Sequence, residues 1–314
     1  MVQTDCLKDF AVFIVGPTAS GKTALAAELA KRFKSVVISA DSVAIYRGLD
    51  IGSAKPTDEE KAIAPHKLID IVDPREEFSV AEYEAAGLKE INSLFSQNKV
   101  PVICGGTGFY VDSLLYVKSY GNCPKNDEIR AKLDDVLKEN GAAYLHSLLE
   151  KVDEKSAKIL HENDTFRVSR ALEIYYSTGK KKSEINDEKI PRFKYFAFTF
   201  DYPRAVLYSR INERVDRMFE KGLLDEVKGL LHSGVKKNAQ SMRAIGYKEV
   251  VEGLERGESE QEIKEKIKLN SRRFAKRQIT YFKRMENLVY LKNFDTLAAA
   301  DEASEYIKNE LERN

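Results

Sequence analysis

The sequence has few of the residues that hold disulfide-rich folds or metal centres together. Its 314 residues include only three cysteines and four histidines. Cys6, Cys104 and Cys123 form no C-x-x-C pair and are odd in number, so the sequence indicates neither a disulfide framework nor a zinc site. This composition suits a reducing compartment, and we expect a cytoplasmic protein.

Long apolar runs and a strong excess of one charge are also missing. No apolar stretch approaches the length that spans a bilayer, and the first one is short and follows no basic leader, so we expect no membrane association. The formal net charge is +1, so any nucleic-acid binding must come from local basic patches. With 43% hydrophobic residues, the chain can bury the core of one large domain or two ordinary ones.

One glycine-rich stretch carries the strongest chemical signal. GPTASGKT, at 16–23, fits the pattern G-x-x-x-x-G-K-[ST] and lies between an apolar, strand-like run (11–15) and a helix-forming run (24–33). Glycines let the backbone curl around an anion, and a helix start supplies free N–H groups. Lysine can reach the outermost phosphate, and the threonine hydroxyl can bind Mg²⁺ or a phosphate oxygen. The residues expected to bind phosphate are Gly16, Pro17, Thr18, Ala19, Ser20, Gly21, Lys22 and Thr23.

The remaining pattern predicts a parallel α/β sheet. Further strands are expected at 35–40, 67–72, 100–104, 195–200 and 288–291. Between the strands expected at 67–72 and 100–104, residues 79–97 are predicted as a helix whose Ser79 and Glu82 form a capping box. Strands that alternate with helices favour a P-loop NTPase-like parallel core.

Strand signals vanish in the middle of the chain. Helical patterns follow one another at 127–140, 142–151, 154–161 and 165–177. We therefore expect an all-helical domain at 119–192, inserted into a core of 1–118 and 193–314 whose C-terminal part is again helical.

Three polar residues lie at the expected carboxyl ends of strands, where ligands bind in open parallel sheets. Asp41 could hold Mg²⁺ through water or accept a proton from a nucleophile, or it could cap a helix. Asp73, before Pro74, fits a turn. Thr107 lies in the glycine turn 105–110, which could face a ligand or be structural.

These residues leave the reaction open. The guanine-reading N-K-x-D motif is missing, and no apolar run ends in Asp-Glu as in a typical ATPase. A small-molecule kinase remains possible, because such enzymes also combine a P-loop with a strand-end aspartate. The residues alone indicate a phosphate-bearing substrate with Mg²⁺ and an unidentified acceptor.

Additional segments together indicate a family. Their order and spacing resemble the bacterial tRNA dimethylallyltransferases, also called tRNA isopentenyltransferases, over about residues 13–284. Besides the loop, they are ISADS (38–42), YRGLDIGSAKP (46–56), HKLIDIVDP (66–74), GGTGFY (105–110), NDTFRVSRALE (163–173), RINERVDRM (210–218), RAIGYKE (243–249) and AKRQ (275–278).

The resemblance implies a prenyl transfer. This family moves a dimethylallyl group from dimethylallyl diphosphate to N6 of the adenosine just 3′ of the tRNA anticodon (position 37). The loop would then hold a diphosphate, whose departure Lys22, Thr23, Arg214 and Mg²⁺ would assist, with Thr23 as a metal ligand. Asp41 would accept the proton of the N6 amine.

The resemblance also implies how RNA is bound. The helical insert would grip the anticodon stem-loop, and the protein would act as a monomer. The expected tRNA-binding residues are Asp41, Ser42, Val43, Ala44, Thr107, Asn163, Asp164, Thr165, Phe166, Arg167, Met242, Arg243, Ala244, Ile245, Gly246 and Tyr247. A basic helix at 272–284, with interleaved Phe274, Tyr281 and Phe282, could bind RNA or be an amphipathic core helix.

Two positions depart from the family pattern, and three alternatives stay open. Ala44 stands where glutamine is usual and would face the target base, and Tyr281 stands where tryptophan is usual. The alternatives are an adenylate isopentenyltransferase acting on free AMP, a P-loop small-molecule kinase and a non-catalytic RNA-binding protein. The insert and the RAIGY segment favour the tRNA enzyme, and the presence of Lys22, Thr23, Asp41 and Thr107 favours catalysis.

Overall fold

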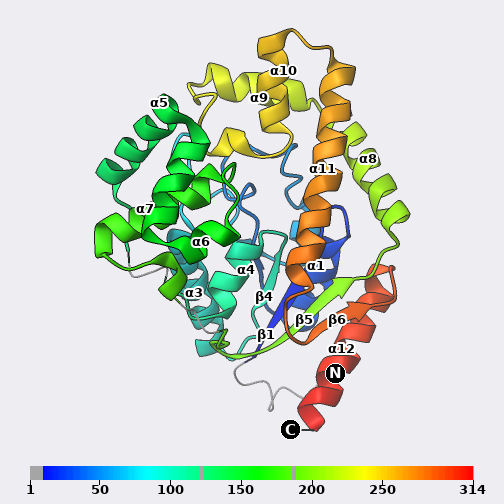
Figure 1. Ribbon diagram of the computed structural model, residues 1–314. Coiled ribbons are helices and arrows are strands. Elements are labelled where there is room, and N and C mark those ends of the chain that lie inside the picture. The colour runs from blue at the N-terminus through cyan, green and yellow to red at the C-terminus, as the bar shows by residue number, and fades with distance from the viewer. Residues whose placement is uncertain (1–9, 120–122, 186–188, 314) are drawn as a thin grey trace. The chain divides into compact units, whose positions relative to one another are not determined.

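The computed structural model describes residues 10–119, 123–185 and 189–313, so Cys6 lies outside the described chain. Within these ranges the chain forms the predicted parallel α/β sheet (Figure 1). The strands are β1 (Phe10–Val15), β2 (Val37–Ser39), β3 (His66–Lys67), β4 (Val102–Gly105), β5 (Lys194–Phe200) and β6 (Leu288–Leu291). Their order is β3-β2-β4-β1-β5-β6, and every pairing is parallel.

Helices cover this sheet and form most of the first of two compact units. They are α1 (Lys22–Arg32), α2 (Asp58–Ile63), α3 (Val80–Ser96), α4 (Gly108–Leu115), α8 (Arg204–Glu220), α9 (Leu223–His232), α10 (Tyr247–Arg256), α11 (Glu260–Phe282) and α12 (Thr296–Glu312). The 3₁₀ turn Ser241–Arg243 precedes α10. The unit comprises the chain up to Leu115 and from Pro191 onward.

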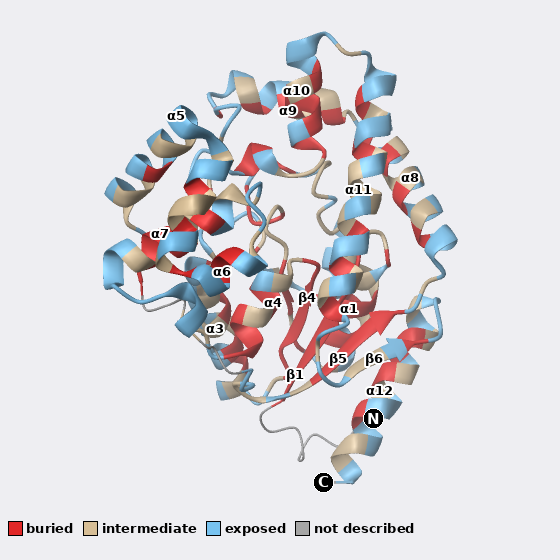
Figure 2. Cartoon of the chain, viewed as in Figure 1, coloured by how far each residue is buried: buried red, intermediate tan, exposed pale blue. Residues whose placement is uncertain are grey.

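Burial explains why β1 lies inside the sheet. Every residue of FAVFIV is buried, as expected for a central parallel strand covered on both faces. Leu25 and Leu29 of α1 pack in the same cluster as Phe198 of β5 and Ala300 of α12. Figure 2 shows this core as buried strands between helices that expose only one side. The carboxyl ends of β1, β2 and β4 consequently meet at one edge of the sheet.

The strand predicted at 67–72 is much shorter in the structure. β3 contains only His66 and Lys67, because Leu68 (φ 60°) and Asp70 (φ 59°) adopt the left-handed conformation, which interrupts strand pairing. Val72 forms an isolated bridge with Tyr46. The predicted cap of α3 is confirmed, since Ser79 Oγ accepts the backbone N–H of Glu82 at 3.2 Å.

The second compact unit spans Tyr116–Ile190, compared with the expected insert of 119–192. It contains α5 (Asp127–Val152), α6 (Glu154–Ile159), α7 (Thr165–Thr178) and the 3₁₀ turn Lys182–Glu184. The two helices predicted at 127–140 and 142–151 form one run, bent at Gly141 (φ 81°). The unit has its own hydrophobic cluster, composed of Leu133, Leu145, Leu149, Ala157, Val168, Ala171 and Leu172.

A buried carboxylate also holds this unit together. Glu173 of α7 accepts hydrogen bonds from Arg130 at 2.9 Å and from Arg170 at 2.7 Å. It also accepts the backbone N–H of Asn126, just before α5. Because two arginines and a backbone donor surround it, the pKa of Glu173 lies below its usual value despite burial, which by itself would raise it.

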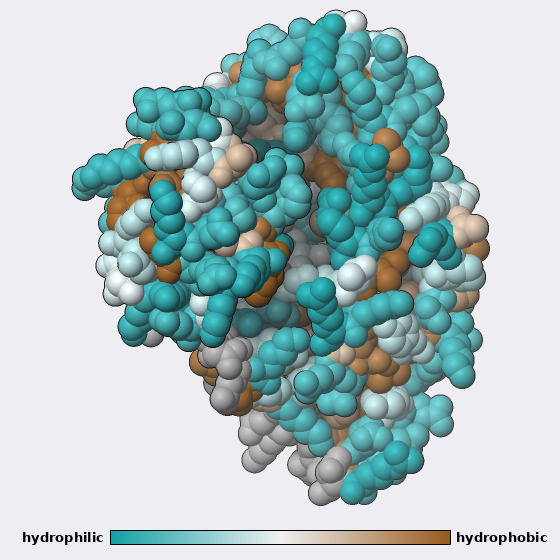
Figure 3. All heavy atoms as spheres, viewed as in Figure 1, coloured by the Kyte–Doolittle hydropathy of each residue, from teal (hydrophilic) through white to brown (hydrophobic). Residues whose placement is uncertain are grey.

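The surface agrees with the charged composition. Figure 3 shows a face that is mostly hydrophilic, with hydrophobic residues scattered across it. In the described part of the chain, no helix is long and apolar enough to cross a membrane.

Candidate active site

The loop 16–23 curls between β1 and α1 as its sequence predicts. Gly16 has φ +133°, and a Cβ atom there would lie 2.5 Å from Thr199 Oγ1 of β5, so only glycine fits. The Ser20 hydroxyl donates to the Pro17 carbonyl at 2.9 Å and is buried. The loop therefore enters α1 with its backbone N–H groups at the helix start, an arrangement that binds anions.

Lys22 and Arg214 are two of the cationic side chains near this loop. Lys22 Nζ donates to the Pro17 carbonyl at 2.5 Å, and Arg214 of α8 donates to the Ser53 carbonyl at 3.1 Å. The pKa of Lys22 is lowered to about 8, mainly by burial; Cys104 and Asp41 oppose this lowering, and the charge of Arg214 contributes to it. Burial also lowers the pKa of Arg214. A multiply charged anion would compensate both of these desolvated cations.

Asp41 uses one carboxylate oxygen locally. Oδ1 accepts the backbone N–H groups of Val43 at 2.8 Å and Ala44 at 3.2 Å, which caps the turn after β2. The second oxygen, Oδ2, has no hydrogen-bond partner in the described chain, and the residue lines both cavities described below. The capping and functional interpretations of Asp41 are therefore compatible. Asp73 instead pairs with Arg75 in a turn and lines neither cavity.

Thr107 connects the glycine turn to the end of β2. Its backbone N–H donates to the Ala40 carbonyl at 3.2 Å, and its Oγ1 accepts the backbone N–H of Ser42 at 3.0 Å. The Thr107 hydroxyl also donates to Ser42 Oγ at 3.2 Å. The turn after β4 thereby fixes the residues on either side of Asp41.

Gln278 of α11 was not identified as a site residue from the sequence. Its Oε1 accepts the backbone N–H of Thr18 at 2.9 Å, and its Nε2 donates to the Gly106 carbonyl at 2.9 Å. The side chain is buried and joins the phosphate loop to the turn after β4. Its sequence signals are that it is uncharged within a basic helix and that it ends the AKRQ segment of the family resemblance.

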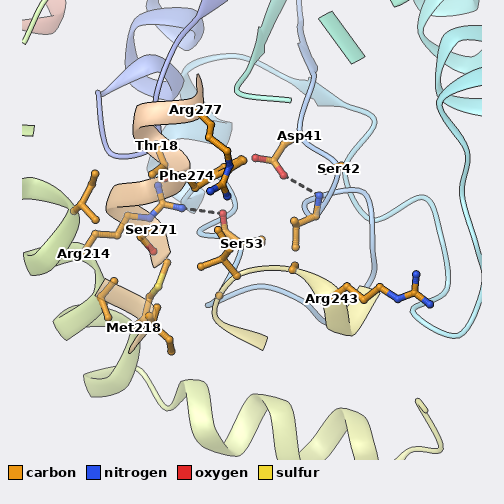
Figure 4. A pocket seen from close by; sticks show the side chains of 17 residues that line it. Thr18, Asp41, Ser42, Ser53, Arg214, Met218, Arg243, Ser271, Phe274 and Arg277 are labelled. Atoms are coloured by element: carbon orange, nitrogen blue, oxygen red, sulfur yellow. Dashed lines mark hydrogen bonds between the residues drawn. The ribbon is translucent and has the colours of Figure 1, made fainter. Parts of the chain in front are cut away.

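Two neighbouring cavities meet at these residues. The larger cavity has a volume of about 290 Å³, and its lining includes Arg243, Ile245 and Arg277. The smaller cavity has a volume of about 100 Å³, and its lining includes Lys22, Thr23 and Ala44. Both are lined by Thr18, Asp41, Ser53, Arg214 and Phe274. Figure 4 shows the larger cavity, with Asp41 on one side and Arg214, Phe274 and Arg277 on another. The phosphate loop thus opens into the smaller cavity, next to a larger one lined with arginines.

The residues present could hold a metal only together with a ligand. In the described chain, no group of three or more His, Cys, Asp or Glu side chains is placed to bind an ion. Thr23 lines the smaller cavity with Asp41. Mg²⁺ commonly takes one or two protein ligands and completes its coordination shell with water and substrate phosphates. Thr23 and Asp41 fit this mode of coordination.

The segment predicted to bind RNA at 242–247 is partly buried. Met242 and Tyr247 are 1% and 0% exposed, so their side chains cannot contact RNA without opening the structure, and the prediction needs this correction. Tyr247 instead donates from its hydroxyl to Glu226 Oε1 at 2.7 Å. Arg243 is exposed, and Ala244 and Ile245 also line the larger cavity.

The other predicted RNA segment begins α7 of the second unit. Asp164 caps this helix by accepting the backbone N–H of Arg167, and its carboxylate lies 3.3 Å from the Arg167 guanidinium. Asn163, Phe166 and Arg167 are exposed. An exposed phenylalanine beside an arginine is a combination that stacks on and pairs with RNA.

The basic helix α11 has a buried face and an exposed basic face. Ala275, Gln278 and Phe282 are buried, which gives the helix an inner face. Arg273, Lys276 and Lys283 are exposed and have no carboxylate partner in the part of the chain that is described. The Arg277 guanidinium lies 5.6 Å from the centre of the Phe274 ring. The aromatic residues therefore differ: Phe282 is core, while Phe274 lines the cavities.

The fold and these contacts define an α/β protein with a P-loop whose candidate phosphate site lies beside a carboxylate. The IPP transferase family model matches residues 44–285, and the isopentenyl transferase model matches 10–67. The chain belongs to the IPP transferase family.

Proteins that are similar to this one over nearly its whole length agree with this assignment. The tRNA dimethylallyltransferase of Acetivibrio thermocellus is 44% identical over 286 residues, which cover 90% of this chain and 91% of the relative. That of a Thermoanaerobacter species is 45% identical over 280 residues, 87% of this chain and 88% of the relative.

Solved structures show the same fold. The tRNA isopentenylpyrophosphate transferase of Bacillus halodurans is 39% identical, with a TM-score of 0.73 and 98% of each chain covered. A eukaryotic dimethylallyltransferase acting on tRNA is 28% identical, with a TM-score of 0.79, covering 96% of this chain and 78% of its own.

Proposed function

We propose that this protein transfers a dimethylallyl group from dimethylallyl diphosphate to N6 of the adenosine just 3′ of the anticodon in tRNA. One observation carries the proposal. Asp41 lies where the cavity next to the phosphate loop meets the larger cavity, and its Oδ2 has no partner in the described chain. A diphosphate donor in one cavity and a nucleobase in the other would therefore approach each other beside a carboxylate. The names of the relatives support the choice of donor and acceptor.

Different residues act on the leaving group and on the nucleophile. As the bond between N6 and the allylic carbon forms, the bond from that carbon to the diphosphate oxygen breaks and its electron pair leaves with diphosphate. Loop N–H groups, Lys22 and Arg214 stabilise the charge on the departing diphosphate. Asp41 accepts the N6 proton. Mg²⁺, held by Thr23 and diphosphate oxygens, would supply further neutralisation of the leaving group.

RNA binding is assigned to three segments. In the second unit, Asn163, Phe166 and Arg167 contact the anticodon arm, while Arg243 and the basic face of α11 contact the RNA backbone near the larger cavity. The target adenosine leaves the loop stack to enter the cavity, as base-modifying enzymes require. We further propose that the protein works as a cytoplasmic monomer.

The test uses two acceptors and one donor. The purified protein, Mg²⁺ and dimethylallyl diphosphate are incubated with either an unmodified anticodon stem-loop or AMP, and nucleosides are analysed by mass spectrometry. Product only on the stem-loop is expected. Product only on AMP would assign an adenylate isopentenyltransferase, and ATP-dependent phosphorylation of a metabolite without prenyl transfer would assign a kinase. Either result would overturn the proposal.

A further inference from the structure

Phe109 is exposed although its neighbours are not. It is the second residue of α4, two positions after Thr107, and 61% of its surface is exposed, whereas Tyr110 and Val111 beside it are buried. Single exposed apolar side chains are common on protein surfaces, so the surroundings of this ring decide whether it has a role. Phe109 lies two residues after Thr107, whose Oγ1 accepts the backbone N–H of Ser42, the residue next to Asp41.

The ring is held in place by a second aromatic residue. Phe109 packs edge-to-face against Tyr281 of α11, with ring centres 5.9 Å apart and an angle of 68° between planes. The Tyr281 hydroxyl donates to Asp112 Oδ2 at 2.7 Å. A Cβ atom at Gly108 would lie 2.2 Å from the Tyr281 ring, so glycine permits this close approach. Phe109 thus offers a preordered aromatic surface that loses little freedom on binding.

Positive charge extends from the larger cavity toward this pair. Arg273, Arg277 and Tyr281 follow one another at intervals of four residues, which places them on one stripe of α11. Both arginines are exposed, and Arg277 lines the larger cavity. Arginines beside an exposed aromatic ring are the pattern that binds single-stranded nucleic acid, in which phosphates meet the charges and a base stacks on the ring.

We propose that Phe109 is a stacking platform for a nucleobase directly adjacent to the target adenosine. The inference rests on the proposed function. Extruding the adenosine removes a stacking partner from its neighbour in the loop, and the face of Phe109 replaces that partner. Phe109 thereby determines specificity by holding the extruded conformation of the RNA, without touching the reacting atoms.

The test is a double-mutant cycle that combines a change in the protein with a change in the RNA. Wild-type protein and Phe109→Ala are assayed with an intact anticodon stem-loop and with two stem-loops, each abasic at one of the two neighbours of the adenosine. With intact RNA, we expect Phe109→Ala to raise KM about tenfold, or ~1.4 kcal/mol, and to leave kcat almost unchanged. With one of the abasic RNAs, KM should be raised in the wild type already, and Phe109→Ala should add little.

Two further variants distinguish the loss of ring stacking from a loss of protein stability and from a loss of side-chain volume. Phe109→Trp should keep the low KM, and Phe109→Leu, which retains an apolar side chain without a ring, should behave like alanine with an unchanged melting temperature. An unaltered KM in both Phe109→Ala and Phe109→Leu, or an equal loss with all three RNAs, overturns the inference while leaving the proposed function intact. Failure of the wild type to prenylate intact RNA overturns both.

Discussion

At the scale of single residues, Asp41 shows how one carboxylate can serve two purposes. The sequence offered cap or base as alternatives, and the structure assigns the cap to Oδ1, while Oδ2 has no hydrogen-bond partner in the described chain. Asp41→Asn keeps an acceptor for the turn but removes the charge. We therefore expect turnover to fall by on the order of 10² or more, with tRNA affinity retained. Single-turnover kinetics and fluorescence anisotropy with labelled stem-loop measure the two effects.

Asp41→Ala serves as the structural control. It removes the acceptor of both N–H groups and should lower the free energy of unfolding by about 1–3 kcal/mol, which Asp41→Asn should not. Equal loss of turnover and RNA binding in the asparagine variant would mean that Asp41 acts only by shaping the site.

Lys22 gives a pH prediction at the same scale. Burial places its pKa at about 8, below its ordinary value of 10.5. The diphosphate needs the protonated form, so kcat/KM for the donor should fall as pH rises through about 8. Lys22→Arg, whose guanidinium stays charged, should lack this decline even if its overall rate is lower. A pH profile of both proteins tests this, and an identical alkaline limb in the two would assign the decline to another group.

The same shift affects stability in the opposite direction. Between about pH 8 and 10.5 the unfolded chain binds more protons at this lysine than the folded protein does. Its contribution therefore makes folding more favourable as pH rises across that window. A loss of activity without a loss of stability above pH 8 is thus the expected signature of Lys22.

At the scale of elements, the sequence predicts features that depend on adjacent residues and misses those that depend on residues far apart in the chain. The buried run of β1 and the capping box of α3 are properties of adjacent residues, and both were predictable. The early end of β3 depends on two left-handed, non-glycine residues that no pattern identifies. Gln278 joins loops 172 and 260 residues away, so its role is defined only by tertiary structure.

A carboxylate on α9 holds the loop that borders the larger cavity. Glu226 accepts the backbone N–H groups of Asp50, Ile51 and Gly52 at 2.9, 2.7 and 3.2 Å, besides the Tyr247 hydroxyl. The next residue, Ser53, is the carbonyl partner of Arg214. The Tyr247 ring leaves no room for a side chain at Gly52. The contact of Tyr247 with Glu226 and Gly52 explains why Tyr247 is buried instead of facing RNA.

Removing that carboxylate should loosen the loop. We expect Glu226→Ala to lower the free energy of unfolding by about 2–3 kcal/mol, because three backbone donors lose a charged acceptor. We also expect KM to rise more than kcat falls, since the loop lines the cavity but supplies no proton. Denaturant unfolding and steady-state kinetics measure these. Tyr247→Phe, which keeps the ring and loses one hydrogen bond, should cost about 1 kcal/mol. Equal costs for the two variants would contradict this account.

At the scale of the whole molecule, the chain leaves the α/β core and returns to it at nearly the same point. The Arg192 backbone N–H donates to the Leu115 carbonyl at 2.8 Å, within the first unit. The second unit encloses its own hydrophobic cluster and its own buried Glu173. All the residues proposed to bind phosphate therefore lie in the first unit, and the proposed anticodon-arm residues at 163–167 lie in the second.

This separation predicts what happens if Tyr116–Ile190 is excised and Leu115 is joined to Pro191 by a short Gly-Ser linker. Because the two ends are already hydrogen-bonded neighbours, we expect the shortened protein to unfold cooperatively. Inorganic diphosphate with Mg²⁺ should raise its melting temperature as in the full chain. Its affinity for the stem-loop should fall by on the order of tenfold or more and should depend less steeply on salt, since phosphate contacts are lost. The full chain carrying Arg167→Ala is the milder control, expected to weaken binding without losing the remaining contacts. A shortened protein that binds the stem-loop with undiminished affinity would place RNA recognition in the α/β core, with Arg243 and α11 as its sole basis.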